Sequence, residues 1–412
     1  MTMRMKKAAL ALLALVMALV VLRFGDTGLV GGPGSGRVSI PNYTANGGLP
    51  KWRACLARVK AGTGNCTVMH IGESTTAAFD ATWSGTTKDA LSAGIPNQLA
   101  GILSTYYSIP TMSSSAIGNH IVDGATGSPA AYLAFNTRVT SMGSWGFDAN
   151  SAHINIGGYA FADSINTGAL TYHPTDTVSY PSAQTIQTDN LDVLVYFLSN
   201  NLVVKVGSTT ICTLITAGLQ SCPATLGDNT YSLDCTGVCS IAGVRARNST
   251  VKAVNMVDAS FGGALIAQFA NVVGAITPWS PDLCIINDLG NDIGVNTPPS
   301  NYQASLITVI QGCQQSGDVL VVTGTVGTQS GQKNNIRAAA QAAAAATNSA
   351  FWDSAALNSI GGSSPSGAGF DPNTNSNYGW NGSYNGAAID PPHQSGIGYG
   401  IYASFLAQIL AQ

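Results

Sequence analysis

The stretch Thr67-Val68-Met69-His70-Ile71-Gly72-Glu73-Ser74-Thr75-Thr76 decides the fold that we predict for this chain. Its apolar run stops at Gly72 and delivers Ser74, which predicts a strand that runs into a tight turn. In open α/β folds such a turn exposes a hydroxyl group at the carboxyl edge of a parallel sheet, where these folds bind ligands. A turn of small residues followed by an ordinary helix cap is the alternative interpretation.

Two later segments have a similar design. Leu283 to Asp292 is an apolar strand that ends in a Gly-Asn-Asp turn, where the amide of Asn291 could donate a hydrogen bond to an oxyanion. Asn255 to Ala264 is a β-like run that ends in Gly262-Gly263, where a bare backbone N–H could approach a ligand closely. A flexible turn without a ligand is the alternative for the second segment.

The segment Asp390-Pro391-Pro392-His393 lies in a Gly-rich, otherwise uncharged tail. It places a carboxylate three residues before an imidazole, and the two rigid prolines can present both side chains from one turn. A serine hydrolase needs a histidine to accept the hydroxyl proton and a carboxylate to orient that histidine. The spacing therefore suits a general base and its orienting acid.

Taken in chain order, these four segments resemble the four signature blocks of the SGNH (GDSL-type) esterase and lipase superfamily. The matching positions are Ser74, Gly263, Asn291 and the Asp390/His393 pair. The resemblance implies that Ser74 is the nucleophile, His393 the general base and Asp390 its orienting partner. It also implies a three-layer α/β/α fold with a flavodoxin-like sheet and a metal-independent, two-step acyl transfer without a cofactor.

The resemblance further implies an oxyanion hole formed by the backbone N–H groups of Ser74 and Gly263 and by the side-chain amide of Asn291. Gly262 and Gly263 could exchange roles. Two positions depart from the family pattern. Glu73 replaces the usual aspartate before the serine, and the glycine of the third block is shifted to the position directly before Asn291. Neither departure removes a group that must do chemistry.

The composition fits an exported enzyme. The chain has 412 residues, enough for one large or two ordinary domains, and 9% of them are charged, with a net charge of −3. No cluster of lysine and arginine follows the first seven residues, so a nucleic-acid partner is not expected. Abundant Ser, Thr, Asn and Gln suit a secreted protein that faces polysaccharide.

The N-terminus predicts export. Arg4, Lys6 and Lys7 precede the apolar stretch from Ala8 to Leu22, which has the length of a signal-peptide core and is short for a transmembrane helix. Because no clear cleavage site follows, an uncleaved N-terminal anchor, and thus a membrane tether, is the alternative. Both interpretations place the catalytic part outside the cytoplasm. The segment 31–36 predicts a flexible linker.

Eight cysteines fall in near pairs, and four disulfides are plausible in an oxidising compartment. The pairs are Cys55/Cys66, Cys212/Cys222, Cys235/Cys239 and Cys284/Cys313. The last pair could instead be two reduced thiols in the core. A metal site at Cys235-x-x-x-Cys239 is disfavoured, because no histidine lies near it and no second pair has ligand spacing.

Between residues 141 and 250 the pattern changes to short β-rich runs at sandwich-like spacing. The predicted strands are His153–Phe161, Leu191–Leu198, Leu202–Val206, Thr209–Thr216 and Ser240–Arg245. This arrangement resembles SGNH esterases that deacetylate polysaccharides and carry a jelly-roll insert similar to a carbohydrate-binding module. A scaffold insert without a ligand is the alternative. The expected domains are 1–36 (leader and linker), 37–140 and 251–412 (the two parts of the hydrolase domain) and 141–250 (the inserted sandwich).

The α/β pattern flanks this insert. Helices are predicted at Lys88–Tyr107, interrupted around Gly94 and Pro96, at Tyr302–Cys313 and at Ile336–Thr347, and strands at Asp318–Val322 and Phe351–Trp352. A long Gly/Ser/Asn-rich loop then leads to the Asp390/His393 turn. Its Tyr378 and Trp380 could stack on a sugar or cover an acyl group, or could simply anchor the loop.

Two polar residues near the blocks receive supporting roles. His70 is expected to be a hydrogen-bonded core residue, since it precedes Ser74 by four positions on the first strand. Asp292 is expected to support the turn of the third block by hydrogen bonding. The preferred substrate is an O-acetyl group on extracellular or cell-wall polysaccharide. The alternatives are a secreted short-chain carboxylesterase or lipase, and a glycan-binding protein without activity. The oligomeric state is not predicted.

Overall fold

The computed structural model describes residues 43–74, 76, 94–118, 132–133, 136, 138–148, 154–155, 157–175, 185–287, 289–323, 332–354, 383–384, 387–388 and 396–412. Its largest sheet has seven strands. In sheet order they are β1 (Tyr43–Thr44), β20 (Ala350–Trp352), β19 (Asp318–Val322), β18 (Leu283–Asn287), β2 (Cys66–Gly72), β17 (Val254–Ser260) and β3 (Thr111–Ser113). All neighbours run parallel except β1, which pairs antiparallel to β20.

The five central strands have the order β17-β2-β18-β19-β20. Numbered along the chain among themselves, they read 2-1-3-4-5, which is the flavodoxin-like order. The sequence-based prediction of this sheet is therefore confirmed, with β3 and β1 added at its two edges.

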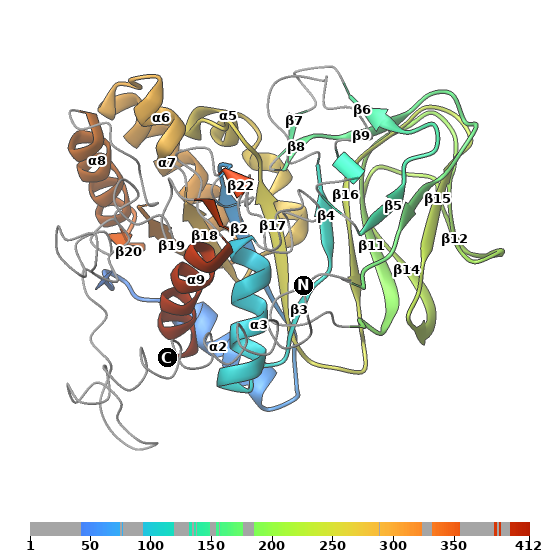
Figure 1. Cartoon of the computed structure of the whole chain (residues 1–412), viewed down its shortest axis with the longest axis horizontal. Coiled ribbons are helices and arrows are strands. Elements are labelled where there is room, and N and C mark those ends of the chain that lie inside the picture. Colours follow the sequence, from blue (N-terminus) through green and yellow to red (C-terminus); the bar gives the residue numbers. More distant parts are fainter. Residues whose placement is uncertain are drawn as a thin grey trace.

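Helices cover both faces of this sheet (Figure 1). On one face, α2 (Pro50–Lys60), α3 (Ile95–Tyr107) and α9 (Gly396–Ala411) share a hydrophobic cluster with Val68 of β2. On the other face, α5 (Ile266–Asn271), α7 (Pro299–Gln314) and α8 (Gln332–Ala346) share a cluster with Met69 and Ile71. Successive side chains of a strand point to opposite faces, so the continuous apolar run of β2 is what two helical layers require. The predicted three-layer arrangement is confirmed.

Two antiparallel sheets form the second part of the molecule, seen on the right of Figure 1. The five-stranded sheet contains β13 (Thr209–Leu214), β12 (Leu202–Val206), β15 (Tyr231–Cys235), β10 (Leu170–Tyr172) and β5 (Val139–Ser141). The six-stranded sheet contains β14 (Gly218–Gly227), β11 (Thr188–Leu198), β16 (Cys239–Arg247), β9 (Phe161–Asp163), β6 (Gly146–Phe147) and β4 (Ser115–Ile117).

The two antiparallel sheets share one hydrophobic core, so they form a β-sandwich. Val193 and Ile241 contribute from the six-stranded sheet, and Val204 and Leu233 contribute from the five-stranded sheet. The jelly-roll class and the domain boundaries stay predictions. Strand β4 joins the sandwich although it precedes residue 141, where we placed the start of the insert.

The sandwich packs directly on the parallel sheet and its helices. Leu194 of β11 and Ala242 of β16 are buried in the same cluster as Met69 of β2 and Trp279 of the short helix η5 (Thr277–Trp279), which follows η4 (Val273–Ala275). The outer face of the six-stranded sheet is thus part of the core that supports β2. The sandwich and the parallel sheet therefore share a hydrophobic core.

Two predicted elements differ from the structure. Helix α3 begins at Ile95 rather than Lys88, because Gly94 has an extended backbone at the N-cap position and Pro96 fits the first helical turn. The run 153–161 is not one strand. Within it, β7 (Ile154–Asn155) pairs antiparallel with β8 (Gly158–Tyr159), and β9 starts at Phe161.

The four predicted disulfides are present, between Cys55 and Cys66, Cys212 and Cys222, Cys235 and Cys239, and Cys284 and Cys313. The alternative of reduced thiols at the last pair is therefore wrong. Within the described part of the chain, no helix combines the length and the apolar character that crossing a bilayer requires. The apolar stretch 8–22 lies outside the described residues.

Candidate active site

The topology places the site at the carboxyl ends of β2, β17 and β18. Strand β2 lies between the other two, and Asn287 at the end of β18 is level with Gly72 at the end of β2. The strand order reverses between β2 and β18, and open α/β sheets bind ligands at such a switch point. The turns that carry Ser74, Gly263 and Asn291 therefore leave the same edge of the sheet side by side.

The turn after β2 is tight and closely packed. The Thr76 N–H donates a hydrogen bond of 2.9 Å to the Glu73 carbonyl, and Ser74, with 8% of its surface exposed, lies inside this turn. A Cβ at Gly72 would stand 2.7 Å from the Asn287 carbonyl oxygen and would also clash with Thr76. Only glycine fits at the last position of β2, which explains why the apolar run stops there.

The carboxylate of Glu73 joins the first block to the third. Its Oε1 accepts a hydrogen bond from the Gly290 N–H at 3.1 Å, and its Oε2 accepts one from the Asn291 N–H at 2.8 Å. Glu73 is 4% exposed. The residue that departs from the family pattern thus has a well-defined partner, namely the first turn of α6 (Gly290–Gly294).

A second contact joins the same two segments. The Asn287 side chain donates a hydrogen bond from Nδ2 to Thr76 Oγ1 at 3.0 Å, and both residues are buried. Neither residue has a role predicted from the sequence. An amide at the last position of an otherwise apolar strand was the signal that could have identified Asn287.

The second block is fixed to the first and the third. The Phe261 N–H donates to the Gly72 carbonyl at 3.0 Å, and Asn291 Nδ2 donates to the Ala264 carbonyl at 3.1 Å. Between these contacts Gly262 is buried, whereas Gly263 is exposed and has a φ of +63°, a conformation that favours glycine. Gly263 is therefore the glycine of the pair that faces solvent.

Asp292 holds the third block against α5. Its Oδ2 accepts a hydrogen bond from the Ile266 N–H at 2.8 Å. This is the supporting contact that the sequence predicted for it. Burial raises the pKa of Asp292 above its ordinary value, although hydrogen bonds from Thr297 and from the Ile266 N–H act in the opposite direction.

His70 differs from its prediction. It is buried on β2 with 1% of its surface exposed, but neither ring nitrogen has a hydrogen-bond partner among the described residues. The expectation of a hydrogen-bonded core histidine is wrong. Its neighbours in register are apolar Ile285 on β18 and Asp258 on β17, and neither is hydrogen-bonded to the ring. Burial lowers the pKa of His70 to about 3, so the ring is neutral at physiological pH.

Four predicted site residues, His393, Asp390, Tyr378 and Trp380, lie outside the described residues. The structure brings together the segments of the first three blocks, and the base and its orienting acid stay predictions.

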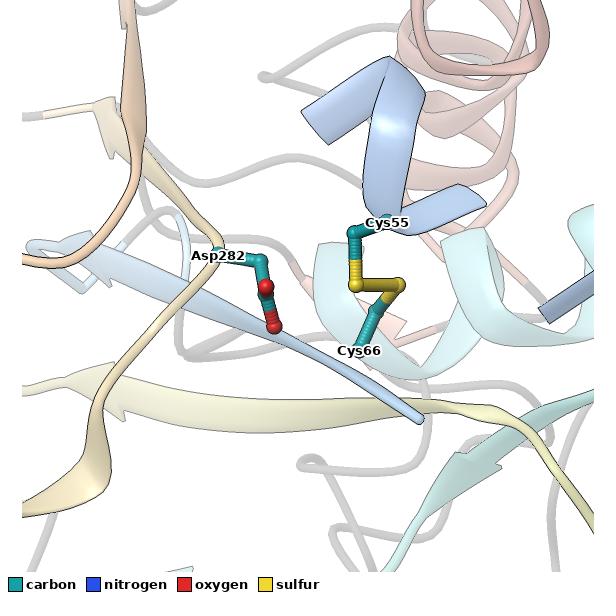
Figure 2. Close-up of side chains that lie close together, drawn as sticks. All are labelled: Cys55, Cys66 and Asp282. Carbon is teal, nitrogen blue, oxygen red and sulfur yellow. A yellow bond between two sulfur atoms is a disulfide. The ribbon is translucent and has the colours of Figure 1, made fainter. Parts of the chain in front are cut away.

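Cys55, Cys66 and Asp282 lie close together and could suggest a metal centre (Figure 2). The two sulfur atoms are bonded to each other, so they are not thiolate ligands. Asp282 already has structural partners, because its Oδ2 accepts a hydrogen bond from the Thr67 N–H at 2.9 Å and its Oδ1 lies 3.5 Å from Arg58. Similarly, the sulfur atoms of Cys235 and Cys239 are joined in a disulfide. These groups therefore stabilise the fold.

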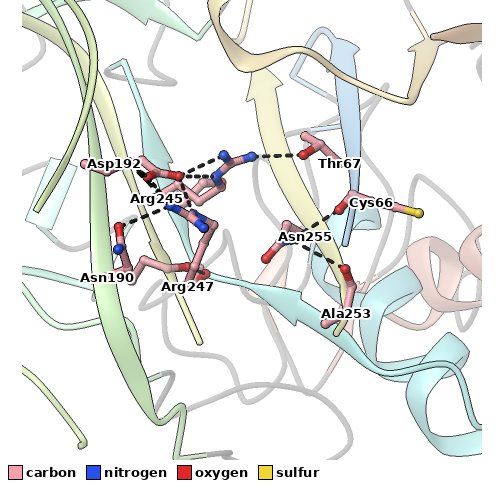
Figure 3. A network of polar contacts seen from close by, with 12 residues as sticks. Cys66, Thr67, Asn190, Asp192, Arg245, Arg247, Ala253 and Asn255 are labelled. Atoms are coloured by element: carbon pink, nitrogen blue, oxygen red, sulfur yellow. Dashed lines mark hydrogen bonds and ion pairs between the residues drawn. The ribbon is translucent and has the colours of Figure 1, made fainter. Parts of the chain in front are cut away.

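A buried ion network joins the sandwich to the amino-terminal half of β2 (Figure 3). Asp192 of β11 accepts hydrogen bonds from Arg245 and Arg247 of β16. Arg245 also donates to Thr67 Oγ1 at 3.1 Å and lies 5.4 Å from the ring centre of Trp279. Burial alone would raise the pKa of Asp192, but the two arginines outweigh it and lower the pKa below its ordinary value.

Comparison with known proteins supports the fold. No protein-family model and no curated protein matches the sequence. A solved peptidoglycan O-acetylesterase is similar in structure, with a TM-score of 0.63 and 16% sequence identity over 89% of this chain and 97% of the other.

Two further solved structures resemble smaller parts of the chain, and both have low TM-scores. AlinE4, an SGNH-hydrolase family esterase, has a TM-score of 0.22 and 16% identity over 24% of this chain and 55% of its own. Phospholipase A1 from Streptomyces albidoflavus has a TM-score of 0.24 and 18% identity over 37% and 79%. The flavodoxin-like strand order and the similarity over nearly the whole chain agree: this chain has the fold of the solved peptidoglycan O-acetylesterase.

Proposed function

We propose that the protein is an extracytoplasmic serine esterase that removes O-acetyl groups from cell-wall or other extracellular polysaccharide. The observation that carries this proposal is the joining of three turns at the switch point. Glu73, Thr76 and Asn291 provide hydrogen bonds between the segments that contain Ser74, Gly263 and Asn291.

In the proposed mechanism Ser74 attacks the ester carbonyl. The backbone N–H groups of Ser74 and Gly263 and the Asn291 amide stabilise the oxyanion. The amide has two hydrogens, and its hydrogen bond to the Ala264 carbonyl uses one and fixes the direction of the other. The exposed position of Gly263 supports its choice over the buried Gly262.

Proton transfer is assigned to the fourth block. His393 accepts the Ser74 proton and returns it to the leaving alcohol, and Asp390 orients the imidazole. Water activated by His393 then attacks the acyl-enzyme and releases the acid, which restores the free serine. The pair is proposed on the resemblance of the sequence block alone.

Several observations support the proposal of a polysaccharide substrate. The solved peptidoglycan O-acetylesterase shares the fold over 97% of its length, and the described insert is a β-sandwich. The four disulfides favour an oxidising compartment outside the cytoplasm. Tyr378 and Trp380 are proposed to contact the sugar, and the N-terminal segment is proposed to be a signal peptide or an anchor.

The test is hydrolysis of p-nitrophenyl acetate, butyrate and octanoate by the full chain and by its Ser74→Ala variant. We expect activity that favours acetate and disappears in the variant, together with release of acetate from O-acetylated peptidoglycan or another acetylated polysaccharide. A preference for octanoate without release from the polysaccharide would identify a carboxylesterase or lipase instead. A folded wild type that hydrolyses no ester would overturn the enzyme proposal and favour a glycan-binding protein.

A further inference from the structure

We propose that Glu73 is a positioning residue whose length is matched to Gly290, so that the two departures from the family pattern compensate each other. This inference rests on the proposed esterase function. Glu73 directly precedes the nucleophile Ser74, and its carboxylate holds the segment that carries the oxyanion donor Asn291.

The contact is made at both oxygens. Oε1 accepts from the Gly290 N–H at 3.1 Å and Oε2 accepts from the Asn291 N–H at 2.8 Å. Carboxylate bonds to backbone N–H groups are charge-assisted and stronger than bonds between neutral groups. Glu73 is 4% exposed, so water competes little for these oxygens. One side chain therefore sets the distance between the serine turn and the first turn of α6.

Asn291 is held at two points. Glu73 binds its backbone N–H, and the Ala264 carbonyl binds its side-chain amide. Movement of the backbone at residue 291 would change the direction of the amide, because the Ala264 contact then acts as a pivot. Glu73 thus acts on the oxyanion site through Asn291 and has no contact with substrate in this role.

Gly290 provides the space that the longer acid requires. A Cβ at residue 290 would lie 2.5 Å from Glu73 Oε1, 3.0 Å from Oε2 and 3.1 Å from Cδ. The 2.5 Å contact is closer than real Cβ atoms approach, so an alanine at this position would displace the carboxylate or α6. An aspartate at residue 73 is one methylene shorter, and its carboxylate would draw back from the added Cβ.

This geometry predicts a coupled pair of substitutions. Gly290→Ala alone should lower kcat for p-nitrophenyl acetate by about 10- to 100-fold, the cost of a misplaced catalytic group, with little change in KM. Adding Glu73→Asp to Gly290→Ala should raise kcat at least about fivefold above that of Gly290→Ala. Glu73→Asp alone should lower kcat, so the effects of the two substitutions are strongly non-additive.

Gly294→Ala is the matched control. It lies in the same short helix, and a Cβ at residue 294 would meet no atom within 4 Å. We expect wild-type kcat, KM and urea midpoint for this control. The urea midpoints of all variants separate a misplaced site from an unfolded chain, and rates are compared where each protein is folded.

The outcomes divide clearly. If wild type hydrolyses acetate, Ser74→Ala does not, and the double variant recovers activity over Gly290→Ala, the inference stands. If the first two results hold but the losses of the single variants multiply in the double variant, the inference is wrong while the esterase function survives. If wild type hydrolyses no ester, both fall.

Discussion

Asn287, the last residue of β18, donates a 3.0 Å hydrogen bond to the hydroxyl of Thr76, two residues after Ser74. Both side chains are buried, with 2% and 0% of their surface exposed. The contact fixes the far end of the serine turn to the neighbouring strand. Glu73 fixes the near end of the same turn to the start of α6.

We expect Thr76→Val to destabilise the protein by about 1–3 kcal/mol, because it leaves the buried Asn287 amide without its acceptor. Urea unfolding gives the change, and Thr76→Ser, which keeps the hydroxyl, should recover most of it. Thr210→Val on the exposed strand β13 is the control and should stay within about 0.5 kcal/mol of wild type. Equal effects at residues 76 and 210 would refute the importance of this contact.

Asn291→Ala should reduce kcat by about 10²–10³-fold, since it removes a donor from the proposed oxyanion hole. The same change removes one hydrogen bond to the Ala264 carbonyl, so a stability loss of about 1 kcal/mol is expected. Steady-state kinetics and urea unfolding separate the two effects. A reduction in kcat of less than about threefold would rule out the donor role.

His70 should make stability depend on pH in mildly acidic solution. Its pKa is about 3 in the folded chain, against an ordinary value of 6.5, so below pH 6.5 the unfolded chain binds a proton that the folded chain does not. The free energy of unfolding should therefore fall as pH decreases towards 3, by up to about 1.4 kcal/mol per pH unit from this residue.

The measurement is urea unfolding of wild type and His70→Leu between pH 7 and pH 4. We expect a flatter pH dependence in the variant. Met69→Leu, a neighbouring buried change without a titrating group, should run parallel to wild type. Parallel curves for His70→Leu and wild type would show that the His70 ring is protonated equally in the folded and the unfolded chain.

Asp192→Ala should cost about 3–5 kcal/mol, because it leaves the buried guanidinium of Arg245 without its carboxylate. The half-buried neighbour Asp189 accepts a hydrogen bond from the Ser249 N–H, and Asp189→Ala is a control expected to cost less than about 1 kcal/mol. Chemical denaturation measures both. A loss at residue 192 no larger than that at residue 189 would contradict the role of the network.

The sequence predicted the parallel sheet well because its strands carry unambiguous signals. Asp318–Val322 in that sheet has the predicted bounds, as does Leu202–Val206 in the sandwich. Strands β14 and β15 were not predicted: β14 is mostly exposed or half-buried and lacks a clear alternation, whereas β15 alternates buried and half-buried residues over only five positions. Helix α9 is apolar on all sides because it is buried against α3 and β20, so it has no amphipathic period.

The candidate site was predictable in part. The positions of Ser74, Gly263 and Asn291 follow from short motifs at strand ends, and the parallel sheet brings such ends together. The contacts between the turns could not be predicted, because Thr76 meets Asn287 across 211 residues of sequence. For the same reason the partners of Glu73 at residues 290 and 291 could not be predicted from the sequence.

The burial of Leu194 and Ala242 in the core of the parallel sheet has a consequence for protein engineering. The sandwich therefore cannot be replaced by another domain simply by joining the chain at the two connections to the rest of the molecule. A graft from another protein would have to reproduce the apolar outer face of β11 and β16 and the reach of Arg245 to Thr67, or it would expose the underside of the strand that delivers Ser74. Substitutions meant to change binding specificity are therefore best placed in the loops and in the five-stranded sheet of the insert.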